Sequence, residues 1–211
     1  MKKHDHLDLI LITLALLVLN APLLLGGSTA HLAYSATRVA DGEWWRLVTH
    51  PFAHVSTYHF ALDAIGFLCL YAALPMRSAT SRMACVTTCA ASSLLIAILF
   101  SPDIATAGLR GLSGPAHGLM ALTGLMMWQD ARGSKADHIA GAAAFVVVAG
   151  KAMLECATGQ VFLSSWHMGS VGLPIVQTHA GGVLGGLLVF ATRDITAEHA
   201  PHHRHCDTVT A

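Results

Sequence analysis

Charged residues are scarce in this chain, and their scarcity argues against most classes of soluble protein. Asp, Glu, Lys and Arg make up 11% of the 211 residues, whereas hydrophobic residues make up 54%. Soluble domains usually contain about 25% charged residues. The composition therefore indicates a single-domain protein that crosses a membrane several times.

The chain also lacks a net charge and a cysteine framework. Its formal net charge is zero, so the charge balance does not favour nucleic acid as a partner. The five cysteines fall mostly in apolar segments and show no disulfide pattern. Cys85 and Cys89 would share one helix face, where we expect them to pack as small apolar residues. We predict no metal site and no cofactor.

Six apolar segments have lengths close to the roughly 20 residues that a membrane helix needs. The first resembles a signal peptide but lacks a clean cleavage site, so we expect it to be retained. We predict an all-α bundle of six transmembrane helices within residues 1–192, followed by a polar, histidine-rich, disordered tail at 193–211. The predicted spans are Leu7–Leu25, Ser56–Leu74, Met83–Phe100, Leu112–Trp128, His138–Leu154 and Val176–Thr192.

Basic residues predict the orientation, because they gather on the cytoplasmic side. With the N-terminus inside, the inner segments would hold Lys2, Lys3, Arg77, Arg82, Arg132, Lys135, Arg193 and Arg204. The outer segments would hold Arg38, Arg46, Arg110 and Lys151. We therefore expect both termini in the cytoplasm.

Three polar residues are predicted to lie at one depth near the outer face. His59, Ser113 and His179 each fall near the start of a span that runs from outside to inside. At about 1.5 Å rise per residue, all three come out on the order of 10 Å below the outer surface. Ionisable residues at membrane depth suggest a functional site.

Small residues would bring two of these spans together. Gly182 and Gly186 share a helix face with His179, and Gly114 and Gly118 form a second ridge beside Ser113. Such ridges let helix backbones approach closely in lipid. The glycines could serve packing alone, and a single membrane serine or histidine is more often structural. Their shared depth favours a Ser113–His179 pair.

This pair predicts serine acyl transfer. His179 would take the proton of Ser113 as general base while the hydroxyl attacks a peptide carbonyl. Free N–H groups at the helix start, with His59, could hold the oxyanion. We expect Glu155–Leu173 to form a mixed loop, and no third carboxylate is evident to orient His179.

Two polar features each allow two interpretations. Asp63 lies one turn after His59, either as a local pair with that histidine or as a protonated donor to the oxyanion. The loop segment Glu43-Trp44-Trp45-Arg46 either anchors the chain at the water–lipid boundary or takes part in the chemistry.

Together these residues resemble the rhomboid family of intramembrane serine proteases, over most of the chain from Trp44 to Phe190. The resemblance implies a six-helix bundle, a Ser113/His179 dyad and an oxyanion site that includes His59. The motifs are Trp45-Arg46, His54 and His59 in His-Val-Ser-Thr-Tyr-His, Gly111-Leu112-Ser113-Gly114, and His179 followed by Gly182 and Gly186.

The chain departs from the family pattern at two positions. Asp63 stands where most rhomboids have asparagine, and His117 stands where many have an aromatic residue that stacks on the catalytic histidine. The imidazole of His117 could stack on His179 or hydrogen-bond to it.

The short length and Gly-Leu-Ser-Gly-x-x-His-Gly are similar to the rhombosortase subgroup of bacterial rhomboids. That similarity implies a bacterial inner membrane location. It also implies substrates with a C-terminal sorting tail, made of a Gly-Gly-type motif, an apolar helix and basic residues.

Two other functions compete with a protease. One is a rhomboid-like protein that binds membrane helices without cutting them, but such relatives generally lack the serine or the histidine. The other is a transporter or metal-handling protein that would use His59, Asp63, His117 and His179, for which the loops offer little support.

Overall fold

The computed structural model describes residues 7–76, 78–130, 133–162, 165 and 168–198, and this part of the chain is helical apart from its connections. The all-α prediction is therefore confirmed. The long helices coincide with the predicted apolar segments: α1 (Leu7–Leu24), α4 (Thr57–Ala73), α5 (Ala79–Phe100), α7 (Ser113–Gln129), α8 (Lys135–Thr158) and α9 (Gln177–Glu198). Short helices lie in the connections: α2 (Ala36–Ala40), α3 (Arg46–Thr49), η1 (His50–Phe52) and α6 (Ile104–Ala107).

Two helix boundaries differ from the sequence prediction in ways that affect the site. A capping box between Ser134 and Asp137 starts α8 at Lys135, before the predicted His138. The same helix continues past Leu154 to Thr158 and ends at Gly159, which takes the left-handed conformation (φ 67°). The expected loop at Glu155–Leu173 is therefore wrong at its start.

The C-terminal boundary also differs. Helix α9 continues past Thr192 as far as Glu198. The remainder of the predicted tail, residues 199–211, lies outside the described part of the chain.

The predicted number of spans is not established. By length and composition, α1, α5 and α8 can cross a membrane, with mean hydropathies of 2.3, 2.1 and 1.7. A fourth candidate in the described residues is the pair formed by Arg46–Phe52 and α4, which is bent by 93°. Helices α4 and α7 have 17 residues each, slightly short of the roughly 20 that span a bilayer unaided.

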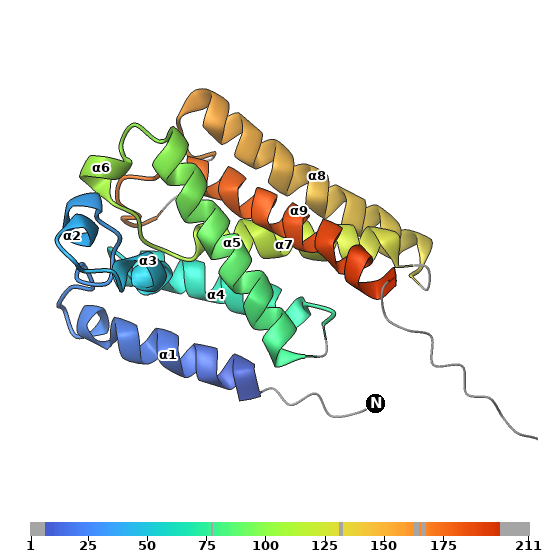
Figure 1. Ribbon diagram of the computed structural model, residues 1–211, viewed down its shortest axis with the longest axis horizontal. Helices are drawn as coiled ribbons and strands as arrows, with labels where there is room; N and C mark the ends of the chain where they lie inside the picture. Colours follow the sequence, from blue (N-terminus) through green and yellow to red (C-terminus); the bar gives the residue numbers. More distant parts are fainter. Residues whose placement is uncertain (1–6, 77, 131–132, 163–164, 166–167, 199–211) are drawn as a thin grey trace, which may run out of the picture.

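Helix α9 occupies the centre of the C-terminal half of the bundle. It packs against α5, α7 and α8, as Figure 1 shows for the red helix between the green and orange ones. Contact with α7 depends on glycine: a Cβ on Gly182 would lie 1.9 Å from the carbonyl oxygen of Gly114. A Cβ on Gly186 would lie 2.4 Å from the carbonyl oxygen of Gly118. The predicted small-residue ridges of Gly114/Gly118 and Gly182/Gly186 thus face each other.

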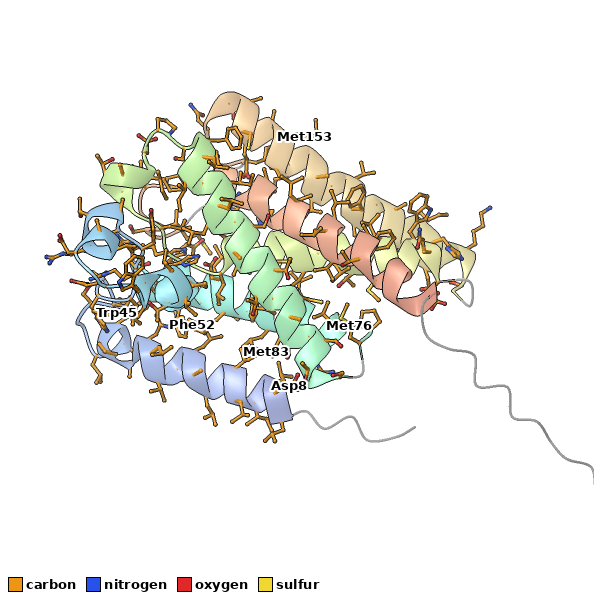
Figure 2. The ribbon with its side chains drawn as sticks, in the orientation of Figure 1. Asp8, Trp45, Phe52, Met76, Met83 and Met153 are labelled. Carbon is orange, nitrogen blue, oxygen red and sulfur yellow. The ribbon has the colours of Figure 1, made fainter. Side chains whose placement is uncertain are left out.

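Helix α1 is held to the bundle at one end by a partly buried ion pair. Arg82 donates to both carboxylate oxygens of Asp8 at 2.7 Å, and the Tyr71 hydroxyl donates to Oδ2 at 2.5 Å. Figure 2 shows Asp8 at the start of α1, with Trp45 and Phe52 near its other end. Arg82, which we expected in an inner segment between spans, is thus a buried residue of α5. We call Asp8, Tyr71 and Arg82 the far-end cluster.

The long connection 26–55 folds around Arg46. Its guanidinium bonds the carbonyl oxygens of Ala30 and Ala33 at 2.8 and 2.7 Å, and the Glu43 carboxylate at 2.6 Å. Trp44 and Trp45 remain 66% and 52% exposed. The contacts favour the anchoring interpretation of this loop, with the arginine as its internal brace and the indoles on its surface.

Candidate active site

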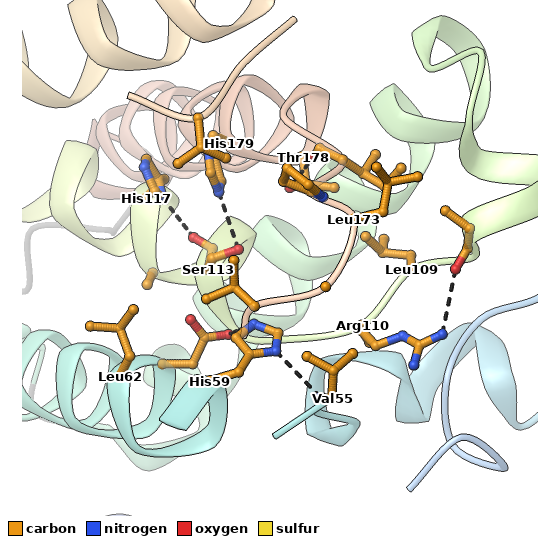
Figure 3. Close-up of a pocket in the computed structure, with 18 of the residues that line it drawn as sticks. Val55, His59, Leu62, Leu109, Arg110, Ser113, His117, Leu173, Thr178 and His179 are labelled. Carbon is orange, nitrogen blue, oxygen red and sulfur yellow. Dashed lines mark hydrogen bonds and ion pairs between the residues drawn. The ribbon is translucent and has the colours of Figure 1, made fainter. Parts of the chain in front are cut away.

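The helix starts of α4, α7 and α9 surround a cavity of about 650 Å³. Figure 3 shows Ser113, His117, His179 and His59 around it, with Arg110 on the connection that precedes Ser113. Burial lowers the pKa of the Arg110 guanidinium from its ordinary value. We call this end of the bundle the pocket end. The three helix starts meet there as the sequence predicted from their common direction.

Ser113 and His179 lie within hydrogen-bond distance in this cavity. The serine is the first residue of α7, and its Oγ lies 3.2 Å from Nε2 of His179. His179 occupies the first turn of α9 and is 8% exposed. The close backbone contact of the two helices at Gly114 and Gly182 brings these side chains together.

Glu155 is the site residue that the sequence analysis missed. Its side chain is fully buried in the last turn of α8, and Oε2 lies 2.5 Å from Nδ1 of His179. Oε1 accepts from Nζ of Lys151 at 2.7 Å and from the N–H of Phe162 at 2.9 Å. A carboxylate that can orient His179 therefore exists as a third group beside Ser113 and His179, contrary to expectation. The Lys151/Glu155 spacing of i, i+4 at the end of an apolar segment was the signal available.

His117 stacks on His179. The ring centroids are 4.0 Å apart with an angle of 10° between the planes. Nδ1 of His117 lies 2.6 Å from the carbonyl oxygen of Ser113, and Nε2 lies 3.0 Å from Nζ of Lys151. Of the two arrangements considered for His117, the structure has stacking, and the ring nitrogens bond other partners. Lys151 lies in α8 and faces this site, to which the sequence analysis did not assign it.

Asp63 braces the connection that leads to Ser113. Its Oδ2 accepts the backbone N–H of Leu112 at 2.7 Å and lies 3.3 Å from Nε2 of His59. The N–H of Val55 points at Nδ1 of His59 at 3.5 Å, which leaves the proton on Nε2, facing Asp63. The geometry favours a local His59–Asp63 pair, with Oδ2 as an acceptor.

Gly111 permits this brace. It has φ of +100°, a conformation that suits glycine, and a Cβ there would lie 2.6 Å from Oδ2 of Asp63. His54, from the same motif as His59, packs on the other side. Its Nδ1 lies 3.0 Å from Oδ1 of Asn20, and its Nε2 is 3.6 Å from Asp63, too far for a good hydrogen bond.

The described residues contain one close group of possible metal ligands at this site. His117, Glu155 and His179 each offer one ligand atom, and these atoms lie within 4.8 Å of one another. Both histidine rings and the carboxylate already have hydrogen-bond partners, and the Lys151 ammonium bonds two of the three residues. A cation held by an ammonium-bound group would meet charge repulsion, so the arrangement suits proton transfer better than metal binding.

Comparison with known proteins identifies the family of this chain. The Rhomboid domain matches residues 41–193, which include all the site residues described above. No curated protein and no solved structure matches the chain. Members of the matched family are generally intramembrane serine proteases. The chain is therefore an integral membrane protein that belongs to the rhomboid family.

Proposed function

We propose that this protein is an intramembrane serine endopeptidase that uses Ser113 as nucleophile and His179 as general base. The observation that carries the proposal is the 3.2 Å approach of Ser113 Oγ to His179 Nε2 inside an open cavity. Nucleophile and base within hydrogen-bond reach are the geometric requirement for this chemistry. A non-catalytic binder of membrane helices would not need that contact.

Each step of the proposed reaction moves one proton through His179. The imidazole takes the hydroxyl proton as Ser113 Oγ attacks the peptide carbonyl carbon. It then gives that proton to the leaving amine as the C–N bond breaks, and the acyl group stays on Ser113. Water next loses a proton to His179 and attacks the acyl carbon, and the serine leaves with the proton.

The start of α7 supplies donors for the oxyanion. The first N–H groups of a helix have no partner within the helix, and the dipole makes this end positive. Ser113 and Gly114 are the first two residues of α7. His59 supports the site from α4, where its Nε2 faces Asp63. Each oxyanion donor in such a site is worth about 3 kcal/mol.

The lining of the cavity suits an apolar substrate segment that is extended near its cleavage site. Leu62, Val55, Phe162 and Leu173 all contribute to the wall. We propose substrates that are transmembrane or carry a C-terminal membrane tail, cleaved near the outer face. On the similarity of the Gly111–Gly118 segment to rhombosortases, the preferred substrates are secreted proteins with Gly-Gly-type sorting tails. The protein then lies in a bacterial inner membrane as six spans with both termini in the cytoplasm.

Co-expression tests this function directly. Candidate tail-bearing secreted proteins are produced with the wild-type protein or with Ser113→Ala, and their processing is compared by immunoblot and mass spectrometry. We expect a C-terminally shortened product with the wild type alone. Equal processing by both proteins would disprove the proposal. A fluorophosphonate probe, which reacts with activated serines, tests the nucleophile without a known substrate.

A further inference from the structure

Five polar side chains at the pocket end, together with the backbone oxygen of Ser113, form a closed ring of hydrogen bonds. From Ser113 Oγ the ring passes to His179 Nε2 at 3.2 Å, and from His179 Nδ1 to Glu155 Oε2 at 2.5 Å. It continues from Glu155 Oε1 to Lys151 Nζ at 2.7 Å and from Nζ to His117 Nε2 at 3.0 Å. His117 Nδ1 then returns to the backbone oxygen of Ser113 at 2.6 Å. Three helices, α7, α8 and α9, contribute to this ring.

The chemistry of the donors fixes the protons around the ring. An ammonium group can only donate, so Nε2 of His117 accepts and Nδ1 carries the proton that bonds Ser113. Glu155 accepts from Lys151 and from the N–H of Phe162, as an ionised carboxylate does. Nδ1 of His179 must then be the protonated nitrogen. Its Nε2 is left with a lone pair that points at Oγ of Ser113.

We propose that Glu155 extends the Ser113–His179 pair to a triad. It is a positioning residue that acts through His179. The carboxylate selects the reactive tautomer of the imidazole and stabilises the imidazolium that forms when Ser113 loses its proton. Lys151 holds Glu155 ionised and in place, and it also fixes the ring of His117 that stacks on His179. This inference deepens the proposed function and rests on it.

The burial of Glu155 supports this role over a purely structural one. A lysine pair would be complete with one carboxylate oxygen, yet the second oxygen of Glu155 bonds the base. The side chain of Glu155 is 0% exposed, whereas that of Lys151 is 27% exposed and lines the cavity. The charge is therefore enclosed on the side of His179.

The rate of fluorophosphonate labelling of the full-length protein in detergent or liposomes tests the inference. Glu155→Gln keeps the shape of the side chain, but its amide can hold the wrong tautomer of His179. We expect labelling to slow by about 100-fold or more, by analogy with the loss on neutralising the acid of a triad. Glu155→Asp keeps the charge and should recover part of the rate.

Asp8→Asn is the matched control. It neutralises another ion-paired acid, the partly buried partner of Arg82 at the far end of the bundle. It should label at the wild-type rate per folded molecule. Thermal unfolding and size-exclusion chromatography report the folded fraction of each variant. With a substrate in hand, Glu155→Gln should lower kcat far more than it changes KM, since Glu155 does not line the cavity.

NMR of the wild type with ¹⁵N-labelled histidine tests the inference even where a variant fails to fold. The inference requires His179 to carry its proton on Nδ1. A proton on Nε2 would overturn it, as would wild-type labelling rates in folded Glu155→Gln. Wild-type labelling in folded Glu155→Gln would leave Ser113 and His179 as a working dyad, whereas a proton on Nε2 would also count against His179 as the base that faces Ser113. Absence of labelling in the wild type, or labelling of Ser113→Ala, would instead remove the proposed function and this inference with it.

Discussion

Two acids lie at opposite ends of this bundle, Asp8 partly buried and Glu155 fully buried, and their partners differ. At the far end, Asp8 joins α1 to α4 and α5 through Arg82 and Tyr71. At the pocket end, Glu155 joins α8 to α9 through His179, and Lys151 donates to its other carboxylate oxygen. Burying a charge is expensive, so each acid must have partners. Both sites meet that requirement with short hydrogen bonds.

The difference lies in the partners. Arg82 is always charged, and its fork fits both oxygens of Asp8, so the far-end cluster has one stable arrangement. Glu155 bonds an imidazole, whose two nitrogens can donate or accept a proton, and this ring faces a cavity. These partners suit the far-end cluster to assembly, and under the proposed function the pocket end moves a proton. Four predictions test this comparison.

Ser113→Ala and His179→Ala should have the largest effect. Each removes a reacting group at the pocket end, so we expect substrate processing to fall by at least about 10⁴-fold. The melting temperature should change little for Ser113→Ala, which removes one oxygen at the cavity, and should fall for His179→Ala, which takes a partner from the buried Glu155. Processing is followed by immunoblot, and unfolding by a thermal shift assay. Residual processing within tenfold of wild type would contradict the assignment.

Asp8→Asn should give the opposite pattern. Removing the charge leaves Arg82 without its acid, which for this partly buried pair should lower the free energy of unfolding by about 1–3 kcal/mol. Labelling of Ser113 per folded molecule should stay the same. Denaturant unfolding measures the first quantity, and Asp41→Asn on an exposed loop should change it by less than about 0.5 kcal/mol. Unchanged stability would show that the far-end cluster is not structural.

Gly182→Ala should affect both properties together. The new Cβ would meet the carbonyl oxygen of Gly114, which forces α9 away from α7 and separates His179 from Ser113. We expect labelling to slow by about tenfold or more, since misplacing a reacting group by 1 Å can cost about 100-fold. Gly150→Ala is the control, because a Cβ there has nothing within 4 Å. That variant should keep activity and gain about 0.5 kcal/mol or more in helix stability. Equal behaviour of both variants would refute the packing argument.

Asp63→Asn should have the smallest effect. An amide oxygen can still accept the N–H of Leu112, so we expect labelling within about threefold of wild type. Asp63→Leu removes the acceptor and should slow labelling at least about tenfold. A large loss in a folded Asp63→Asn protein would show that the site needs the carboxylate itself.

The sequence predicted the parts of this molecule that depend on regular patterns. Apolar segments of about 20 residues marked the long helices. Their alternating direction predicted that Ser113 and His179 would start helices at one end. The spacing of Gly182 and Gly186 predicted the face of α9 that packs on α7, which the structure confirms.

The missing parts depend on details that hydropathy does not carry. Glu155 was not predicted as a site residue because, in the sequence, a buried acid at a helix end cannot be distinguished from the first polar residue of a loop. Only the capping of α8 at Ser134 and Gly159 decides that the helix extends over it. Asp63 stayed ambiguous because its partner is the backbone N–H of Leu112, and no side-chain pattern reports a backbone contact.

The contact of Gly114 with Gly182 also bears on which second mutations could rescue a damaged protein. When two side chains collide, a smaller partner can relieve the collision. Here the obstacle is a main-chain oxygen on a residue that is already the smallest possible. Suppressors of Gly182→Ala should therefore be absent from position 114, and a genetic screen would have to recover them from segments that let α9 shift as a whole.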